Sequence, residues 1–327
     1  MISGSVRMKI AVTGRNFSSP DDTDALALLQ NAGYEINDYS AYDFGSGTSE
    51  DEVIRAIGNA EIVIAGLEPI SRRVISACPN LKLVSRRGIG YDSVDLGACK
   101  ERNIAVVRTT GAVESAVAEH AMAFILYFAR RLHEQNAAMH AGKWQRVMMP
   151  GAKNRTLGLV GFGGIGKEIA KHATPFCMNV LYNCRHPKSE WEKEYNVHYA
   201  PMDALLSQSD YVVACVPLTD ATYHLFGENE FAAMKRGSVF INIARGQIVD
   251  TLALKSALDS GYLGGAGIDA FDNEPCSDSP LIDCPNAILT PHTAPYTSEN
   301  FCEMNLRAAQ NVLDYVKGTL ENKYRVV

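Results

Sequence analysis

Three glycines near the middle of the chain constrain its fold more than any other part of the sequence. Gly161, Gly163 and Gly166 have the spacing G-x-G-x-x-G, and they follow the apolar run LGLV and precede a segment with helical periodicity. In parallel α/β proteins such a turn needs one glycine for a sharp bend, one for close approach of the backbone to a pyrophosphate, and one for packing of the helix on the strand. The pyrophosphate then lies at the helix N-terminus. The turn therefore predicts a strand, a helix and a dinucleotide cofactor.

The same spacing also fits a glycine-rich turn in an α/β domain that binds no nucleotide. A second strand-like run, NVLYN, follows the predicted helix and favours the cofactor interpretation. In NAD-binding units an acidic residue about 20 residues after the glycines usually binds the ribose 2′-hydroxyl. This chain reads LYNCRHPKSE there, with Cys184 and Arg185 at the end of the predicted strand and Glu190 as the first carboxylate.

The basic residues of this segment predict the type of cofactor. Arg185 could pair with a 2′-phosphate through two hydrogen bonds, and Lys188 adds a second positive charge. Because the carboxylate that would repel the phosphate is missing, NADP is favoured over NAD. A solvated basic turn that admits both cofactors fits the same residues.

Short β-branched runs alternate with amphipathic segments along most of the chain, which is typical of parallel sheets covered by helices. The predicted strands are KIAVTG, YEINDY, EIVIAG, LKLVSRRG and IAVVRTT before residue 110, then TLGLVGFG, NVLYN, DYVVACVP, SVFINIARG, GGAGIDAF and NAILTPH. A helix is expected to open at Asp21 or Asp22, a long apolar helix to run from Ala116 to about His140, and a last helix from about Ser298 to Lys317. This order predicts an α/β protein of two doubly wound parallel-sheet domains, the second inserted into the first.

Composition narrows the class of protein. At 327 residues the chain is long enough for two domains. Its formal charge of −6, with scattered Lys and Arg, argues against a nucleic-acid surface, and no window has the ~18 apolar residues of a membrane span. The eight cysteines form no C-x-x-C pair and no cluster with histidine, so we interpret them as reduced thiols of a cytoplasmic protein without a metal site. Residues 1–7 are expected to be a loose leader.

Three polar residues near predicted strand ends are candidates for catalysis. His292 follows a strand in LTPHTAPY, Arg245 ends an otherwise apolar strand, and Glu274 lies in a loop just beyond another strand. Catalytic groups of open α/β proteins gather at the carboxyl ends of strands. Together these residues supply an acid/base, a carboxylate to orient and charge it, and a forked cation for a carboxylate substrate. His120, in the predicted apolar helix, is interpreted as a packing residue.

These motifs occur in an order that resembles one protein family. The segments SRRGIGYDSVD, SAVAEHAMA, VGFGGIG, VPLT, NIARGQIVD, GIDAFDNEP and TPHTA span nearly the whole chain. They are similar to those of the D-isomer-specific 2-hydroxyacid dehydrogenases, which include D-3-phosphoglycerate dehydrogenase and the glyoxylate/hydroxypyruvate reductases. The resemblance implies hydride transfer between NAD(P)H and a small 2-keto or D-2-hydroxy acid, such as glyoxylate or hydroxypyruvate. It also implies that Arg245, Glu274 and His292 form the catalytic triad.

The resemblance further implies how the chain is divided. A flavodoxin-like substrate-binding domain is expected at 1–110 and 296–327, with an NAD(P)-binding Rossmann domain at 111–295 inserted into it. The implied cofactor contacts are Gly161, Gly163, Gly164, Ile165, Gly166, Cys184, Arg185, His186, Lys188, Val216, Pro217, Thr222, Ala244, Asp269 and His292. The implied substrate contacts are Gly66, Leu67, Arg87, Gly88, Ile89, Gly90 and Arg245.

Family members commonly dimerise through the cofactor domain and the region of the predicted helix 116–140. This helix carries more apolar surface than one domain needs to cover, which predicts a two-fold homodimer. The apolar residues concerned are Met122, Phe124, Ile125, Leu126, Tyr127 and Phe128.

Three alternatives remain open within this fold. D-3-phosphoglycerate dehydrogenases carry a phosphate-binding arginine after the third N-terminal strand, where this chain has Glu68 in AGLEPIS, although Arg86 and Arg87 could compensate. The formate dehydrogenase branch has Gln as the partner of the catalytic histidine, and Glu274 argues against it. A corepressor-type binding protein on the same fold would recognise partner peptides, and no long disordered tail or basic run supports that role.

Overall fold

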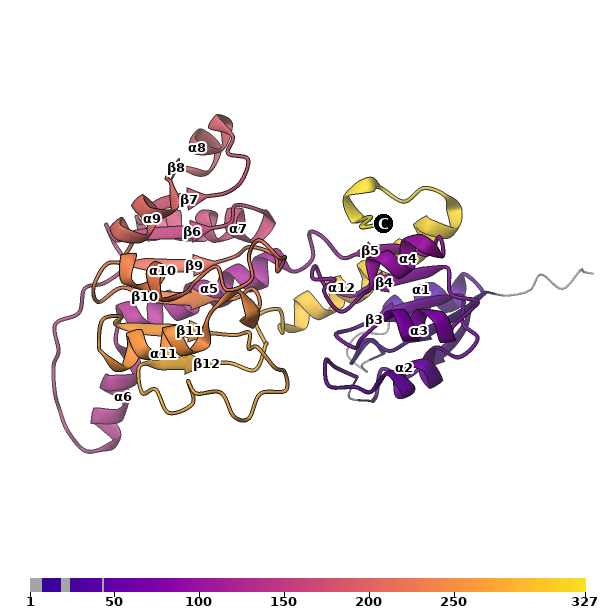
Figure 1. The fold of residues 1–327 in the computed structure, drawn as a ribbon, viewed down its shortest axis with the longest axis horizontal. Helices are drawn as coiled ribbons and strands as arrows, with labels where there is room; N and C mark the ends of the chain where they lie inside the picture. The colour runs from indigo at the N-terminus through magenta and orange to yellow at the C-terminus, as the bar shows by residue number, and fades with distance from the viewer. Residues whose placement is uncertain (1–7, 19–23, 43) are drawn as a thin grey trace, which may run out of the picture. The chain divides into compact units, whose positions relative to one another are not determined.

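The computed structural model describes residues 8–18, 24–42 and 44–327, and the chain divides into two compact units (Figure 1). One unit contains the chain up to Val113 together with Tyr296–Val327, and the other contains Glu114–Pro295. The expected leader 1–7 and the helix start expected at Asp21 or Asp22 lie outside the described residues. No described helix is long and apolar enough to cross a membrane.

The first unit is built on a five-stranded parallel sheet. Its strands are β1 (Lys9–Val12), β2 (Glu35–Asp38), β3 (Ile62–Ala65), β4 (Leu83–Arg86) and β5 (Ala105–Arg108). Their order is β2-β1-β3-β4-β5, with Ile10 paired to Ile36 on one side and to Ile62 on the other. This is the flavodoxin-like order, and strand order reverses between β1 and β3. The five strands predicted before residue 110 are all present.

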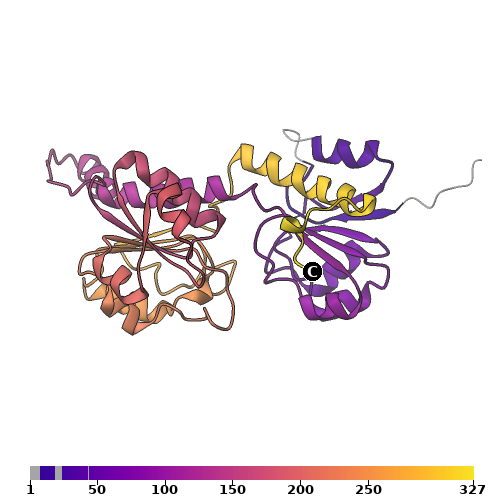
Figure 2. The ribbon, with the colours of Figure 1, turned by 90° about the horizontal axis from the view of Figure 1, so that it is seen from above.

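Helices cover both faces of this sheet. They are α1 (Asp24–Asn31), α2 (Glu50–Ile57), α3 (Arg72–Ala77), α4 (Leu96–Glu101) and α12 (Ser298–Lys317). Leu29 of α1 and Val312 of α12 share a core with Ile10, whereas Ala11 belongs to the core under α2, α3 and α4. Successive strand residues point to opposite faces, so the apolar runs fill both cores. Figure 2 shows α12 running alongside α1, far from it in sequence.

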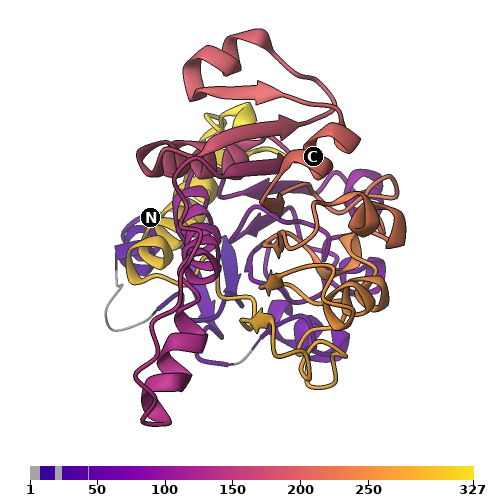
Figure 3. The same cartoon turned by 90° about the vertical axis from the view of Figure 1, so that its left-hand side faces the viewer.

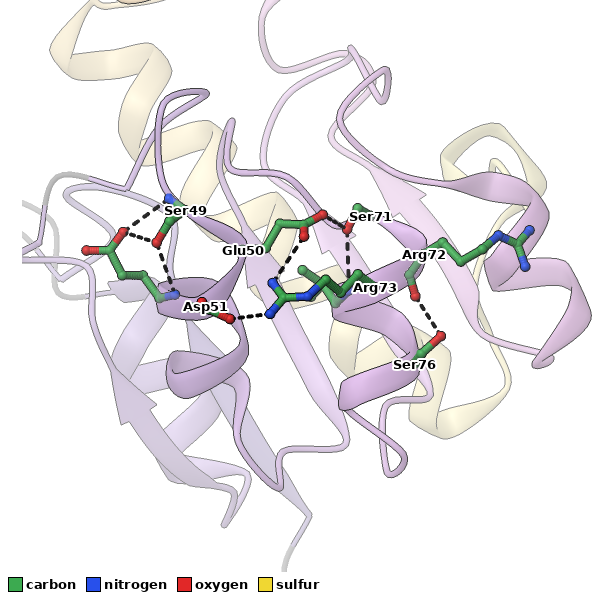
Figure 4. Close-up of polar contacts among 9 residues, drawn as sticks. Ser49, Glu50, Asp51, Ser71, Arg72, Arg73 and Ser76 are labelled. Atoms are coloured by element: carbon green, nitrogen blue, oxygen red, sulfur yellow. Dashed lines mark hydrogen bonds and ion pairs between the residues drawn. The ribbon is translucent and has the colours of Figure 1, made fainter.

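The short helix α3 was missing from the sequence-based prediction, and its start is set by a local cap. The Ser71 side chain accepts a hydrogen bond from the N–H of Val74 at 3.3 Å, as expected of an N-cap residue. Ser71 also donates to Glu50, and Arg73 pairs with both Glu50 and Asp51 at the start of α2 (Figure 4). These exposed pairs align two short helices but add little stability.

The second unit is built on a seven-stranded parallel sheet. Its strands are β6 (Thr156–Val160), β7 (Asn179–Asn183), β8 (Val197–Tyr199), β9 (Tyr211–Ala214), β10 (Val239–Asn242), β11 (Gly265–Ile268) and β12 (Ala287–Leu289). The order β12-β11-β10-β9-β6-β7-β8 is the doubly wound order of dinucleotide-binding proteins extended by one strand, and it reverses between β6 and β9. The edge strand β8 was not predicted, because it has only three residues and a single buried side chain.

Seven α-helices connect and cover these strands in the described part of the unit. They are α5 (Glu114–Ala129), α6 (Leu132–His140), α7 (Gly164–Ala173), α8 (Ser189–Tyr195), α9 (Met202–Gln208), α10 (Glu228–Ala233) and α11 (Thr251–Asp259). Helices α5 and α7 share one core with the sheet, and α9, α10 and α11 share the core on the opposite face. Parallel strands and two covered faces confirm the predicted fold class.

The prediction of one long apolar helix from Ala116 to His140 is wrong. The helix breaks at Arg131, which has a left-handed backbone (φ 46°), and α6 then runs on beyond the sheet (Figure 3). The apolar composition belongs to α5, where Phe124 and Phe128 are buried against the strand β11. A Cβ built at Gly267 of β11 would lie 2.7 Å from the Phe124 ring, so the glycine makes room for it. All nine residues of α6 are exposed or half-buried because its sequence has no apolar stripe.

Candidate active site

The carboxyl ends of β10, β11 and β12 bring three distant polar residues to one edge of the second unit. Arg245 follows β10, Glu274 follows β11 and His292 follows β12. The three strands are neighbours in the sheet, so their exit loops are neighbours too. Ligands of open α/β sheets bind at this edge.

Glu274 and His292 form a hydrogen-bonded pair. His292 Nδ1 lies 3.0 Å from Glu274 Oε1 and 2.8 Å from Oε2, and the Phe271 N–H also donates to Oε1 at 3.0 Å. Burial raises the pKa of Glu274, but the hydrogen bond and charge of His292, the Phe271 N–H and the charge of Arg245 outweigh it and lower the pKa. Glu274 is therefore ionised at neutral pH, and its stabilising charge is lost only as the pH falls through that lowered pKa. Because Nδ1 is engaged, Nε2 is the ring atom left for a substrate.

A buried carboxylate holds the turn that carries His292. His292 has a left-handed backbone (φ 52°), which costs a non-glycine residue about 1–2 kcal/mol. Asp269 Oδ1 accepts from the N–H of Thr293 at 2.8 Å, and its Oδ2 accepts from the N–H of Ala294 at 2.9 Å. Asp269 is 1% exposed. Asp269, which the resemblance implied as a cofactor contact, thus uses both carboxylate oxygens to hold the turn after β12.

Arg245 lies against the Glu274 loop because the next residue is glycine. A Cβ on Gly246 would overlap the backbone of Phe271, so only glycine lets the β10 exit loop pass the β11 exit loop this closely. The Arg245 Nη1 donates to the carbonyl of Ala244 at 2.7 Å, and the Asn242 side chain donates to the Arg245 carbonyl at 2.8 Å. These bonds shape the loop that presents the half-buried guanidinium.

The glycine turn has the close approaches that its spacing predicted. Gly161 has φ +104°, and a Cβ there would lie 2.5 Å from the Cys215 carbonyl oxygen. A Cβ on Gly166 would lie 2.5 Å from the Gly161 carbonyl, where α7 passes over β6. At Gly163, by contrast, no described atom lies within 4 Å of a built Cβ, and this N-cap has no side-chain cap for α7. The turn thus leaves open space at Gly163, as the close approach of a pyrophosphate requires, while the Glu114 side chain packs against Gly164.

The remaining residues that the resemblance implied as cofactor contacts lie in neighbouring loops. Val216 and Pro217 follow β9, and Thr222 Oγ1 donates to the Pro217 carbonyl at 2.7 Å, which closes the turn. After β7, Cys184 is half-buried, whereas Arg185, His186 and Lys188 are exposed. Lys188 lies 3.9 Å from Glu190 and 5.4 Å from the centre of the Trp191 ring. Ala244 is half-buried beside Arg245, and Gly164 and Ile165 begin α7.

The implied substrate contacts of the first unit fall into two groups. The N–H of Gly66 is already donated to Glu68 at 3.0 Å, and that of Gly88 to Thr109 at 2.9 Å. Arg87 is buried, donates to Asn305 at 3.0 Å and lies over the Phe301 ring. Among the described residues, the N–H groups of Leu67, Ile89 and Gly90 make no hydrogen bond. These three amides are therefore the donors left for an anion.

The sequence-based interpretation of His120 as a packing residue was incomplete. Its ring packs edge-on against Phe124, but its Nε2 lies 3.1 Å from Thr290 Oγ1 and 3.7 Å from Asp269 Oδ1. Thr290 was not singled out either, although it stands two residues before His292. Within the described residues, no group of three or more His, Cys, Asp or Glu side chains could hold a metal ion.

A doubly wound sheet with a glycine turn and a hydrogen-bonded Glu–His pair at adjacent strand ends is typical of dinucleotide-dependent oxidoreductases. Residues 122–294 match the family described as D-isomer specific 2-hydroxyacid dehydrogenase, NAD binding domain. The chain belongs to this family, and it is an NAD(P)-dependent oxidoreductase of small 2-keto and 2-hydroxy acids.

Curated relatives and solved structures agree with this assignment. The chain is 36% identical over 280 residues to a glyoxylate reductase of Korarchaeum cryptofilum, covering 83% of this chain and 84% of that one. It is 36% identical over 274 residues to a glyoxylate/hydroxypyruvate reductase B of Citrobacter koseri, covering 82% and 85%. The crystal structure of a glyoxylate reductase from Paecilomyes thermophila matches with a TM-score of 0.85 at 29% identity, covering 98% of this chain and 99% of that one.

Replacing Glu274 by Gln is expected to change the pH profile of keto-acid reduction. Gln keeps a hydrogen bond to His292 but lacks the negative charge that favours the imidazolium ring. On the hypothesis that the protonated His292 ring is the acid of reduction, the variant should lose activity at a lower pH than the wild type as the pH rises. Initial rates across about pH 5 to 9, at saturating cofactor, measure this shift.

Glu228→Gln, at an exposed position in the first turn of α10, is the matched control and should leave the profile unchanged. Identical profiles and rates for wild type and Glu274→Gln would show that Glu274 does not act on His292.

Proposed function

We propose that Arg245, Glu274 and His292 are the catalytic triad of a reductase that converts a small 2-keto acid, glyoxylate or hydroxypyruvate, to its 2-hydroxy acid. The observation that carries this proposal is the Glu274–His292 pair, which leaves Nε2 available at the carboxyl edge of the sheet. In the proposed division, the NAD(P)-binding domain spans 111–295, and the substrate-binding domain spans 1–110 with 296–327.

In the proposed mechanism Arg245 binds the substrate carboxylate through its forked guanidinium. The nicotinamide cofactor, when bound, supplies the hydride for C2. His292 Nε2 gives its proton to the developing alkoxide, and Arg245 stabilises the charge on the same oxygen. Glu274 keeps Nδ1 of His292 protonated and so fixes which nitrogen faces the substrate.

An unphosphorylated substrate fits the first unit better than a phosphorylated one. Glu68 lies in the loop after β3, fully buried, and accepts hydrogen bonds from Thr13 and from the Gly66 N–H. A carboxylate at this position repels a phosphate group.

A panel of keto acids that includes 3-phosphohydroxypyruvate, run with both NADPH and NADH, tests whether the substrate is phosphorylated. Inactivity on the whole panel would instead favour a corepressor-type binding protein on the same fold.

Arg245→Lys is expected to fold normally and lose catalysis. A lysine ammonium is a point charge and cannot reproduce the planar two-pronged contact of a guanidinium with a carboxylate. The expected loss in kcat/KM is ~10² or more, about 3 kcal/mol of transition-state stabilisation. Arg236→Lys is the control, because Arg236 is exposed and precedes the same strand that Arg245 follows. An Arg245→Lys enzyme within about threefold of wild type would remove Arg245 from the site.

NADPH is the proposed preferred cofactor, with NADH also used. The segment after β7 supports this preference, because NAD-selecting units carry an acidic residue there. In this chain the segment exposes Arg185, His186 and Lys188 instead. Arg185→Ala should lower kcat/KM for NADPH while leaving that for NADH nearly unchanged, because only NADPH carries the 2′-phosphate. Lys193→Ala, which removes an equal charge from an exposed position of α8, is the control. A wild type that prefers NADH would contradict the proposal.

A two-fold homodimer in the cytoplasm is the proposed state of the protein. The apolar residues of α5 are largely used within their own unit, so support for a dimer comes from α6 and the segment after it. Leu132, Met139, Trp144 and Met148 are 50%, 54%, 76% and 94% exposed there. Large exposed apolar side chains mark interaction surfaces where they cluster, and these four are close in sequence. All eight cysteines are free, which fits a reducing compartment.

Light scattering at micromolar concentration should give twice the chain mass of 35.6 kDa. Met139→Glu should shift the species toward monomer, whereas Leu252→Glu, at an exposed position of α11, should not. A wild-type monomer would contradict the dimer.

A further inference from the structure

A chain of hydrogen bonds leads from α5 to the turn that carries His292. His120 Nε2 lies 3.1 Å from Thr290 Oγ1, and Thr290 Oγ1 donates to Asp269 Oδ1 at 2.6 Å. The same Oδ1 accepts from the N–H of Thr293, the residue directly after His292. Three successive hydrogen bonds therefore connect the His120 ring to the backbone beside His292.

The directions of these bonds decide which nitrogen of His120 carries a hydrogen. A threonine hydroxyl has one hydrogen, and Thr290 gives it to the carboxylate of Asp269. The Thr290 oxygen can then only accept from His120, so Nε2 must be the donor. Phe124 packs edge-on against the His120 ring with 4.7 Å between ring centres, which limits the positions that the ring can take.

The Asp269 carboxylate can hold the turn after β12 in only one orientation. Its two oxygens serve different amides, Oδ1 that of Thr293 and Oδ2 that of Ala294, so rotation of the carboxylate would release one of them. Thr290 shares Oδ1 and so opposes that rotation. The left-handed backbone of His292 persists only while its surroundings hold it.

We infer that His120 is a positioning residue for the reaction. By donating to Thr290 it keeps the Asp269 carboxylate in the orientation that holds the His292 turn, and through that turn it sets the direction of His292 Nε2. The inference rests on the proposed function for the role of His292, whereas the hydrogen-bonded chain itself can be tested without turnover.

The experiment compares three single variants and one double variant. His120→Phe keeps an aromatic ring without the donor, His120→Gln keeps a donor amide, and Thr290→Val removes the hydroxyl. His120→Phe and Thr290→Val should each lower kcat for glyoxylate or hydroxypyruvate about 10- to 100-fold, the scale of a misplaced catalytic group. KM and the Kd for NADPH should stay within about threefold. The double variant should lose no more than either single variant, because both interrupt one chain.

His120→Gln should recover at least about tenfold of the kcat lost in His120→Phe, since its amide can donate to Thr290. His198→Phe, at an exposed position of β8, should behave as wild type. A His120→Phe enzyme with wild-type kcat would overturn the inference. So would a His120→Gln enzyme as slow as His120→Phe with the same drop in Tm, because that result describes packing alone.

A readout without substrate separates this inference from the proposed function. In spectra of protein labelled with ¹⁵N-histidine, the His292 ring signals should shift in His120→Phe and stay in place in His120→Gln and His198→Phe. If the wild type reduces no keto acid, the proposed function fails, and the spectra still decide whether His120 acts on His292. Unchanged His292 signals in His120→Phe would overturn the inference.

Discussion

The buried carboxylate of Asp269 is the contact on which the candidate site depends. It accepts one hydroxyl and two backbone N–H groups, all from residues 290–294. A buried carboxylate needs such donors, because an unpaired one would carry a large desolvation cost. The chain after β12 supplies these donors by folding into a turn in which His292 has a left-handed backbone. That turn brings the His292 ring to Glu274, so the hydrogen bonds that Asp269 accepts also determine where the His292 ring lies.

The parallel sheet explains why residues far apart in sequence lie near one another. Arg245, Glu274 and His292 follow three strands that are adjacent in the order β12-β11-β10, and parallel strands all end at the same edge. Close approach of the loops then requires small residues between them. Gly246 meets that requirement, since a Cβ there would overlap the backbone of Phe271. The charge of Arg245 thereby contributes to the low pKa of Glu274.

Features with a strong local signal were predictable from the sequence. The glycine turn, the two groups of strands and the last helix follow from glycine spacing and from apolar runs that alternate with amphipathic segments. Elements with a weak local signal in the sequence were missed or predicted with wrong bounds. The three-residue strand β8 has too few apolar positions to recognise, and α3 is only six residues long. The predicted helix 116–140 is two helices, because average apolarity does not reveal a left-handed residue such as Arg131.

The sequence by itself determined the two doubly wound units, the glycine turn and the three polar residues at strand ends, because these depend on periodicity and backbone freedom within short segments. Only the tertiary structure decided how polar groups are paired. The His120 ring is hydrogen-bonded to Thr290, 170 positions away in the sequence. The Gly66 N–H donates to the Glu68 side chain, and the Asp269 carboxylate accepts from the N–H of Thr293. The physical reason is that a hydrogen bond depends on the distance and direction between two atoms, and for residues on different elements these are set only when the sheets and helices pack.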